Sequence, residues 1–171
     1  MDSKVYENLR PYTDEEVPSA MKRIASEPDF FRAMNFIFPE KNNTEVEDLL
    51  KKIKTTGDLQ QHIMHPAIRS IVKKTSSGLS HSGFENLKPD EAYLFISNHR
   101  DIFLDAGLLQ ILLFEHGLPT SEIAFGSNLM SSPLIINAGK SNKMFTAYRS
   151  GHNRKEVYEN TKNFSEYIRK T

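Results

Sequence analysis

The residues best suited to chemistry lie in the segment SNHRDIFLD, residues 97–105. It contains His99 and two acids, Asp101 and Asp105, which are close enough in sequence to reach the imidazole ring. An imidazole can take a proton from a substrate hydroxyl at neutral pH, while a carboxylate on its other nitrogen fixes the tautomer and stabilises the imidazolium. The segment therefore predicts a general base with an orienting acid. The alternative is that Asp101 caps the following helix and His99 only hydrogen-bonds within the turn.

A second candidate site lies in YRSGHNR, residues 148–154, where a predicted strand turns into a predicted helix. The candidate binding residues are Arg149, Ser150, Gly151 and Arg154. Guanidinium groups bind phosphate oxygens in pairs, a glycine lets the backbone approach closely, and a helix N-terminus adds partial positive charge. With Lys140 and Lys143 upstream, the segment predicts an anion site. The alternative is a solvated basic turn balanced by Glu156 and Glu159.

The elements expected to position these residues alternate between strand and helix after residue 78. Strands are predicted at residues 93–97, 122–127 and 143–149, and helices at residues 104–117, 129–139 and 153–169. Such alternation favours a mostly parallel sheet flanked by helices, in which ligands bind beyond the carboxyl ends of the strands. Both candidate sites follow a predicted strand, which supports a functional interpretation.

The first part of the chain is predicted to be helical. Thr44 and Glu47 have the spacing of a capping box, and Pro66 is expected to kink or restart a helix. The aromatic-rich residues 30–38 are expected to be largely buried. The predicted fold class is α/β, with a helical N-terminal region, residues 1–77, followed by the N-terminal part of an α/β domain, residues 78–171.

The composition excludes several classes of function. The 22 basic and 22 acidic side chains give a net charge of zero, which argues against a nucleic-acid partner. Without cysteine there is no thiolate nucleophile, and without a P-loop or G-x-G-x-x-G motif a nucleotide cofactor has no support. We expect no cofactor and no metal. The sequence contains neither a secretory signal nor a run of about 18 apolar residues that would span a membrane.

The segment FISNHRDIFLDAGLL resembles the first signature block of the glycerolipid acyltransferases, the family of glycerol-3-phosphate and 1-acylglycerol-3-phosphate acyltransferases. The hallmark of that block is N-H-x-x-x-x-D after a buried strand. KMFTAYRSGHNRKE is similar to the second block, a strand that leads into a phosphate-binding arginine. The similarity covers about residues 79–170.

This resemblance implies an enzyme of phospholipid biosynthesis with a glycerol-3-phosphate acyltransferase-like fold. His99 would deprotonate a hydroxyl of glycerol-3-phosphate or its 1-acyl form, which attacks the thioester of acyl-CoA or acyl-carrier-protein. Arg149, together with Arg154, would hold the phosphate of the acceptor. It also implies a cytoplasmic protein with peripheral contact to the inner face of the cell membrane.

The sequence departs from the family pattern in two places. The family acid falls at Leu104, whereas the acids here are Asp101 and Asp105; the context L-D before an apolar helix favours Asp105. No third block with Pro-Glu-Gly or Glu-Gly-x-Arg follows before Thr171, so the domain is expected to be C-terminally incomplete and acyl transfer to need a longer form. Two alternatives stay open: a non-catalytic lipid- or anion-binding module, and an esterase that uses Ser80 of GLSHS.

Overall fold

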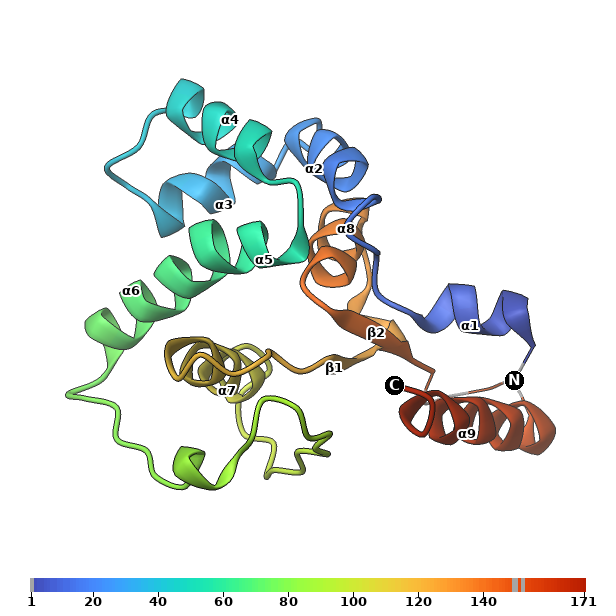
Figure 1. The fold of residues 1–171 in the computed structure, drawn as a ribbon. Coiled ribbons are helices and arrows are strands. Elements are labelled where there is room, and N and C mark those ends of the chain that lie inside the picture. Colours follow the sequence, from blue (N-terminus) through green and yellow to red (C-terminus); the bar gives the residue numbers. More distant parts are fainter. Residues whose placement is uncertain (1, 149–150, 152) are drawn as a thin grey trace. The chain divides into compact units, whose positions relative to one another are not determined.

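The computed structural model describes residues 2–148, 151 and 153–171. These residues are mostly helical and include a small two-stranded parallel sheet (Figure 1). Contacts group the chain into two compact units: unit 1 comprises residues up to Leu59 together with Glu122–Thr171, and unit 2 comprises Gln60–Ser121. Unit 2 therefore contains helical residues 65–75 together with residues beyond 77. The expected domain boundary at residue 78 stays a prediction.

Unit 1 contains most of the helices and the sheet. Its elements are α1 (Ser3–Leu9), α2 (Val17–Ala25), α3 (Phe30–Ile37), α4 (Asn43–Lys52), α5 (Thr56–Leu59), β1 (Ile123–Gly126), a 3-10 turn (Ser127–Leu129), α8 (Pro133–Ser141), β2 (Met144–Ala147) and α9 (Arg154–Ile168). The strands expected at residues 122–127 and 143–149 are therefore confirmed as β1 and β2. They pair in parallel, with Ile123 opposite Met144 and Gly126 opposite Ala147.

The sheet of unit 1 packs against its two terminal helices. Phe145 of β2 stacks on Tyr167 of α9 with ring centroids 4.8 Å apart, and Tyr6 of α1 stacks on the same tyrosine at 5.4 Å. Leu9 completes this buried cluster. The hydroxyl of Tyr167 donates a 2.7 Å hydrogen bond to Glu122, just before β1. The C-terminal helix thus contacts β2 through Phe145 and the residue just before β1 through Glu122.

Local sequence explains how several helices begin. The capping box of α4 uses Asn42 and Glu45, whose side chains each accept from the other's backbone N–H. The expected pair Thr44 and Glu47 is wrong, because the chain is already helical at Asn43. Asn153 caps α9, as its sequence position suggests.

The aromatic-rich residues 30–38 form α3 and its C-cap. Phe30, Met34 and Phe38 are buried, four residues apart, whereas Phe36 is 75% exposed. Since residues four apart share a helix face, burial of that face is confirmed and Phe36 lies on the opposite one.

Unit 2 is built on two helices, α6 (His65–Thr75) and α7 (Leu104–Glu115), with a π-helical turn (Gln60–Met64) and a 3-10 turn (Phe84–Asn86). The π turn immediately precedes Pro66, which cannot donate a backbone hydrogen bond, so the expected irregularity is confirmed. Helix α7 packs closely on α6 because Gly107 has no side chain: a Cβ there would lie 2.8 Å from Ile68. Ile68, Ile111 and Leu112 form the buried cluster between the helices.

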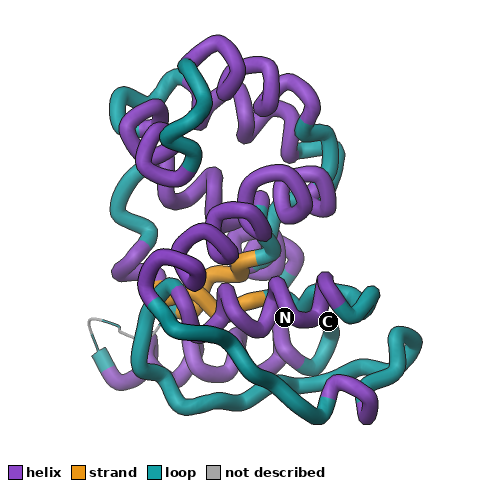
Figure 2. Tube along the Cα trace, turned by 90° about the vertical axis from the view of Figure 1, so that its left-hand side faces the viewer, coloured by secondary structure: helices purple, strands orange, loops and turns teal. Residues whose placement is uncertain are grey.

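The predicted strand at residues 93–97 is wrong. These residues form part of the long loop between α6 and α7 (Figure 2), and Ile96 is 87% exposed. No backbone hydrogen bond joins residues 92–98 to another described residue. An apolar run predicts a strand only if a neighbouring strand accepts its hydrogen bonds, and no described strand does so here. The expected larger sheet is reduced to β1 and β2.

No helix in the described part of the chain combines the length and the apolar character that a membrane crossing requires.

Candidate functional site

His99 and Asp105 meet at the start of α7. The Nδ1 atom of His99 lies 2.9 Å from Oδ2 of Asp105, which is in the first turn of the helix. The carboxylate therefore accepts the Nδ1 proton, and the lone pair of the neutral ring is left on Nε2. The side chain of His99 is 63% exposed, and the described residues offer no partner to its Nε2. This nitrogen is free to accept a proton from a ligand.

Neutral backbone groups hold the Asp105 carboxylate. Its Oδ2 accepts from the N–H of Arg100 at 2.6 Å and from that of Asp101 at 2.9 Å. The N–H of Asp101 is the main cause that lowers the pKa of Asp105. Desolvation is the next largest effect and acts against it, and the N–H of Arg100 and the His99 ring lower the pKa by smaller amounts. Asp105 is thus ionised at neutral pH and directs its charge to His99.

Asp101 has a different position from Asp105. Its Oδ1 accepts from the N–H of Phe103 at 2.8 Å and from that of Leu104 at 2.7 Å. Its carboxylate therefore satisfies free backbone donors at the start of α7, as an N-terminal cap does. Of the two acids that the sequence left open, the structure brings Asp105 to the ring and Asp101 to the helix backbone.

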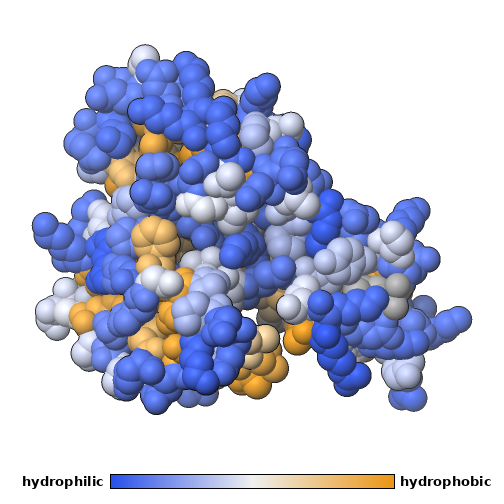
Figure 3. All heavy atoms as spheres, viewed as in Figure 1, coloured by the Kyte–Doolittle hydropathy of each residue, from blue (hydrophilic) through white to orange (hydrophobic). Residues whose placement is uncertain are grey.

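Exposed apolar side chains flank the candidate base in the sequence. Before His99 these are Leu94 and Ile96, which are 67% and 87% exposed, and after it Ile102 and Phe103, at 62% and 46%. In the space-filling view, apolar atoms reach the surface over the elements of unit 2 (Figure 3). These exposed side chains could contact an apolar ligand group.

The predicted anion site is described only in part. Arg149 and Ser150 lie outside the described residues. Gly151 lies directly against the first turn of α9, since a Cβ there would be 2.9 Å from the backbone nitrogen of Val157. Arg154 is the first residue of α9 and is exposed. The glycine thus permits close packing of the chain on α9, whereas its expected role in the approach of an anion stays a prediction.

The two upstream lysines are engaged within unit 1. The Nζ of Lys140 donates to the carbonyl of Asn8 at 2.9 Å and lies 5.8 Å from the ring centre of Tyr12. Burial lowers the pKa of Lys140 and also that of Lys143. These cations contribute to packing, and an anion site at the start of α9 depends on the arginines. Gly151 and Arg154 belong to unit 1, whereas His99 and Asp105 belong to unit 2.

A second histidine–carboxylate pair, which sequence reasoning missed, connects α6 to α7. The Nε2 of His65 lies 2.7 Å from Glu115, and the guanidinium of Arg69 binds both oxygens of that carboxylate, Nε at 2.6 Å. Arg69 is the main cause that lowers the pKa of Glu115. The only local signal was that His65 and Arg69 lie one helical turn apart; nothing in the sequence indicated Glu115.

Two other features offer less for catalysis. Ser80 is exposed, and among the described residues no hydrogen bond joins it to a histidine, so the esterase alternative lacks its base.

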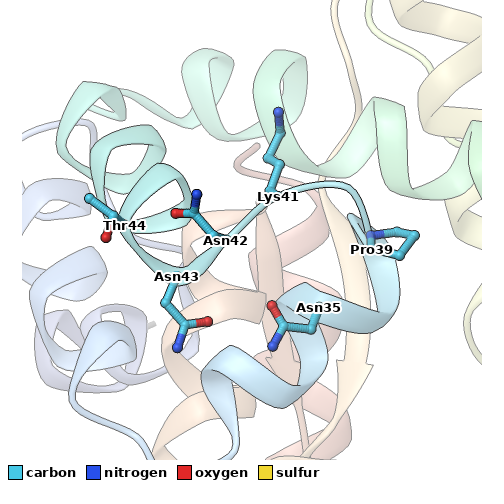
Figure 4. A pocket seen from close by; sticks show the side chains of 6 residues that line it. All are labelled: Asn35, Pro39, Lys41, Asn42, Asn43 and Thr44. Carbon is cyan, nitrogen blue, oxygen red and sulfur yellow. The ribbon is translucent and has the colours of Figure 1, made fainter.

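An open pocket of about 940 Å³ in unit 1 is lined by Asn35, Pro39, Lys41, Asn42, Asn43 and Thr44 (Figure 4). It contains amides and a hydroxyl but no paired acid and base, and Asn42 is already used in the cap of α4.

Within residues 2–148, 151 and 153–171, no three His, Asp or Glu side chains gather in a way that could hold a metal ion.

Comparisons of the chain with models of protein families, with curated proteins and with solved structures gave no match. Support for a function therefore comes from the geometry at His99 and from the sequence motifs.

Proposed function

We propose that the protein is an O-acyltransferase of the glycerolipid acyltransferase type. It would move a fatty acyl chain from acyl-CoA or acyl-carrier-protein to a hydroxyl of glycerol-3-phosphate or 1-acylglycerol-3-phosphate. The observation that carries the proposal is the 2.9 Å contact of His99 Nδ1 with Asp105, which leaves Nε2 exposed to solvent. Residues 93–97 do not form the buried strand that precedes this motif in the resembled family, so the proposal rests on the motif and on this contact.

The reaction follows from the orientation of the ring. The acceptor hydroxyl gives its proton to Nε2 of His99 as its oxygen attacks the thioester carbonyl, and the imidazolium faces the carboxylate of Asp105. The C–S bond then breaks, and the proton passes from His99 to the departing thiolate. The products are an ester and a thiol, and no covalent intermediate with the protein is needed.

Substrate contacts would come from groups of different character. The apolar side chains that flank His99 in the sequence suit an acyl chain, because its burial against them removes apolar surface from water. By the resemblance, Arg149 and Arg154 would hold the acceptor phosphate, to which guanidinium groups can donate paired hydrogen bonds. A peripheral contact with the inner face of the cell membrane would bring the lipid substrate to the enzyme.

A non-catalytic lipid- or anion-binding module is the second candidate. The exposed apolar side chains Leu94 and Ile96 favour it, because they suit a lipid chain whether or not chemistry follows. Such a module would bind inorganic phosphate or a lysolipid but would not cleave a thioester at any pH.

The test is acceptor-dependent thioester cleavage. Palmitoyl-CoA is incubated with glycerol-3-phosphate or with 1-acylglycerol-3-phosphate, and free thiol and acylated product are measured together. We expect equal amounts of both, and a loss of about 10²–10⁴-fold in the His99→Ala variant. His65→Ala is the matched control and should retain its turnover. Because acyl transfer is expected to need a longer form, the assay uses the chain extended through the third block. Undiminished transfer by His99→Ala in that form, or no transfer by that form to either acceptor, would contradict the proposed function.

A further inference from the structure

Asp101 connects the start of α7 to the acid that faces His99. Its side chain accepts from the N–H groups of Phe103 and Leu104. Its own N–H donates to the carboxylate of Asp105 at 2.9 Å, and its carbonyl accepts from the N–H of Asp105 at 3.4 Å. One residue therefore contacts both the backbone and the side chain of Asp105.

The side-chain contacts of Asp101 determine the shape of this turn. If its Oδ1 were removed, the N–H groups of Phe103 and Leu104 would lose their acceptor. The turn would then keep only its contacts with Asp105, which are the N–H groups of Arg100 and Asp101 on the carboxylate and the 3.4 Å backbone contact. The N–H of Asp101 would then no longer be fixed toward the carboxylate of Asp105. That N–H is one of the two backbone donors that orient the acid beside His99.

We propose that Asp101 is a positioning residue, whose carboxylate holds the turn in which Asp105 orients the ring of His99. It acts through Asp105 and does not contact the ring itself. The importance of this arrangement for catalysis rests on the proposed function, whereas the orientation of the ring does not. A simple cap makes a different prediction: its loss would lower the stability of α7 and leave His99 unchanged.

The test compares variants at Asp101 by the ring nitrogens of His99 in two-bond ¹H–¹⁵N NMR spectra at neutral pH. Asp101→Ala removes the acceptor, and Asp101→Asn keeps an Oδ1 in the same place. Asn42→Ala, which removes the cap of α4 in unit 1, is the matched control for loss of a cap as such. Backbone amide spectra report whether each variant is folded.

We expect Asp101→Ala to change the single Nδ1-protonated tautomer into a mixture, and Asp101→Asn and Asn42→Ala to keep it. If Asp101→Ala disturbs unit 2 as a whole, Asp101→Gly replaces it, since glycine is tolerated at caps but offers no side-chain oxygen. Unchanged ring nitrogens in the folded alanine or glycine variant would overturn the proposal. A tautomer that changes as expected in a protein whose extended form shows no acyl transfer would support the positioning role and contradict the proposed function, so the two failures are distinguishable.

Discussion

The two histidine–carboxylate pairs of unit 2 differ in how the acid is held. In His99–Asp105 the carboxylate contacts Nδ1 and is supported by two backbone N–H groups. In His65–Glu115 the carboxylate contacts Nε2 and is bound by the guanidinium of Arg69. The residue types are nearly the same, but only the first acid has no cationic side chain among its hydrogen-bond donors.

This difference separates a candidate base from a structural contact. Arg69 binds both oxygens of the Glu115 carboxylate, so His65 shares this acid with a permanent cation. Neutral amides leave the full charge of Asp105 directed at His99, and the Nε2 of that ring stays open. A nearby carboxylate is therefore insufficient evidence for a catalytic histidine. The other groups that bind the carboxylate decide its role.

Replacement of each acid by its amide should give the largest contrast. Asp105→Asn lets the amide donate to Nδ1, which favours the tautomer with the proton on Nε2, so acyl transfer should fall by about 10²–10⁴-fold. Glu115→Gln should leave transfer almost unchanged. Initial rates of acceptor-dependent thiol release measure both variants. Similar losses in the two variants would show that the pairs do not differ in function.

Glu115→Gln should lower the stability of the protein, although it should leave acyl transfer almost unchanged. Glu115→Gln removes an ion pair between α6 and α7, and because Arg69 is 39% exposed the expected loss in the free energy of unfolding is only about 1 kcal/mol. Urea unfolding followed by circular dichroism measures it. If Glu115→Gln were as stable as the unsubstituted protein, the structural role given to this pair would be incorrect.

Acid should weaken the Glu115 pair in a predictable direction. Because folding lowers the pKa of Glu115, its contribution to stability is fully present above the ordinary carboxyl value of about 4.5 and is lost as pH falls through the lowered folded value. Arg69→Gln removes the main cause of this shift. The free energy of unfolding of that variant should therefore depend less on pH below about 4.5. An identical pH dependence in both proteins would contradict this assignment.

Salt should produce the smallest effect. The main cause of the lowered pKa is a charged side chain for Glu115 and a backbone N–H for Asp105. Since salt screens exposed charges, it should raise the pKa of Glu115 toward its ordinary value more than that of Asp105. Carboxyl ¹³C NMR titrations at low and high NaCl measure how far salt raises each pKa. Equal increases for Glu115 and Asp105 would contradict the proposed difference between the two carboxylates.

The sequence predicted short-range features better than long-range ones. The predicted features that were found include Asn153 as a cap, the irregular helix near Pro66, and β1 and β2. These predictions depended on local residue types. The strand at residues 93–97 was wrong because strand formation needs a hydrogen-bonding partner, which an apolar run does not specify.

At the candidate site the sequence limited the choice of acid but did not make it. Asp101 and Asp105 are both near His99 in sequence, and the backbone of the turn determines which carboxylate reaches the ring. The pair of His65 and Glu115 could not be expected, since its members are 50 residues apart. Contacts of that kind depend on how α6 packs against α7.

The protonation of the His99 ring tests the account most directly. Two-bond ¹H–¹⁵N spectra of the unsubstituted protein at neutral pH should show the proton on Nδ1 and a lone pair on Nε2, whereas His65 should show the proton on Nε2, the atom that faces Glu115. A proton on Nε2 of His99, or an even mixture of its tautomers, would mean that Asp105 does not prepare this ring as a base.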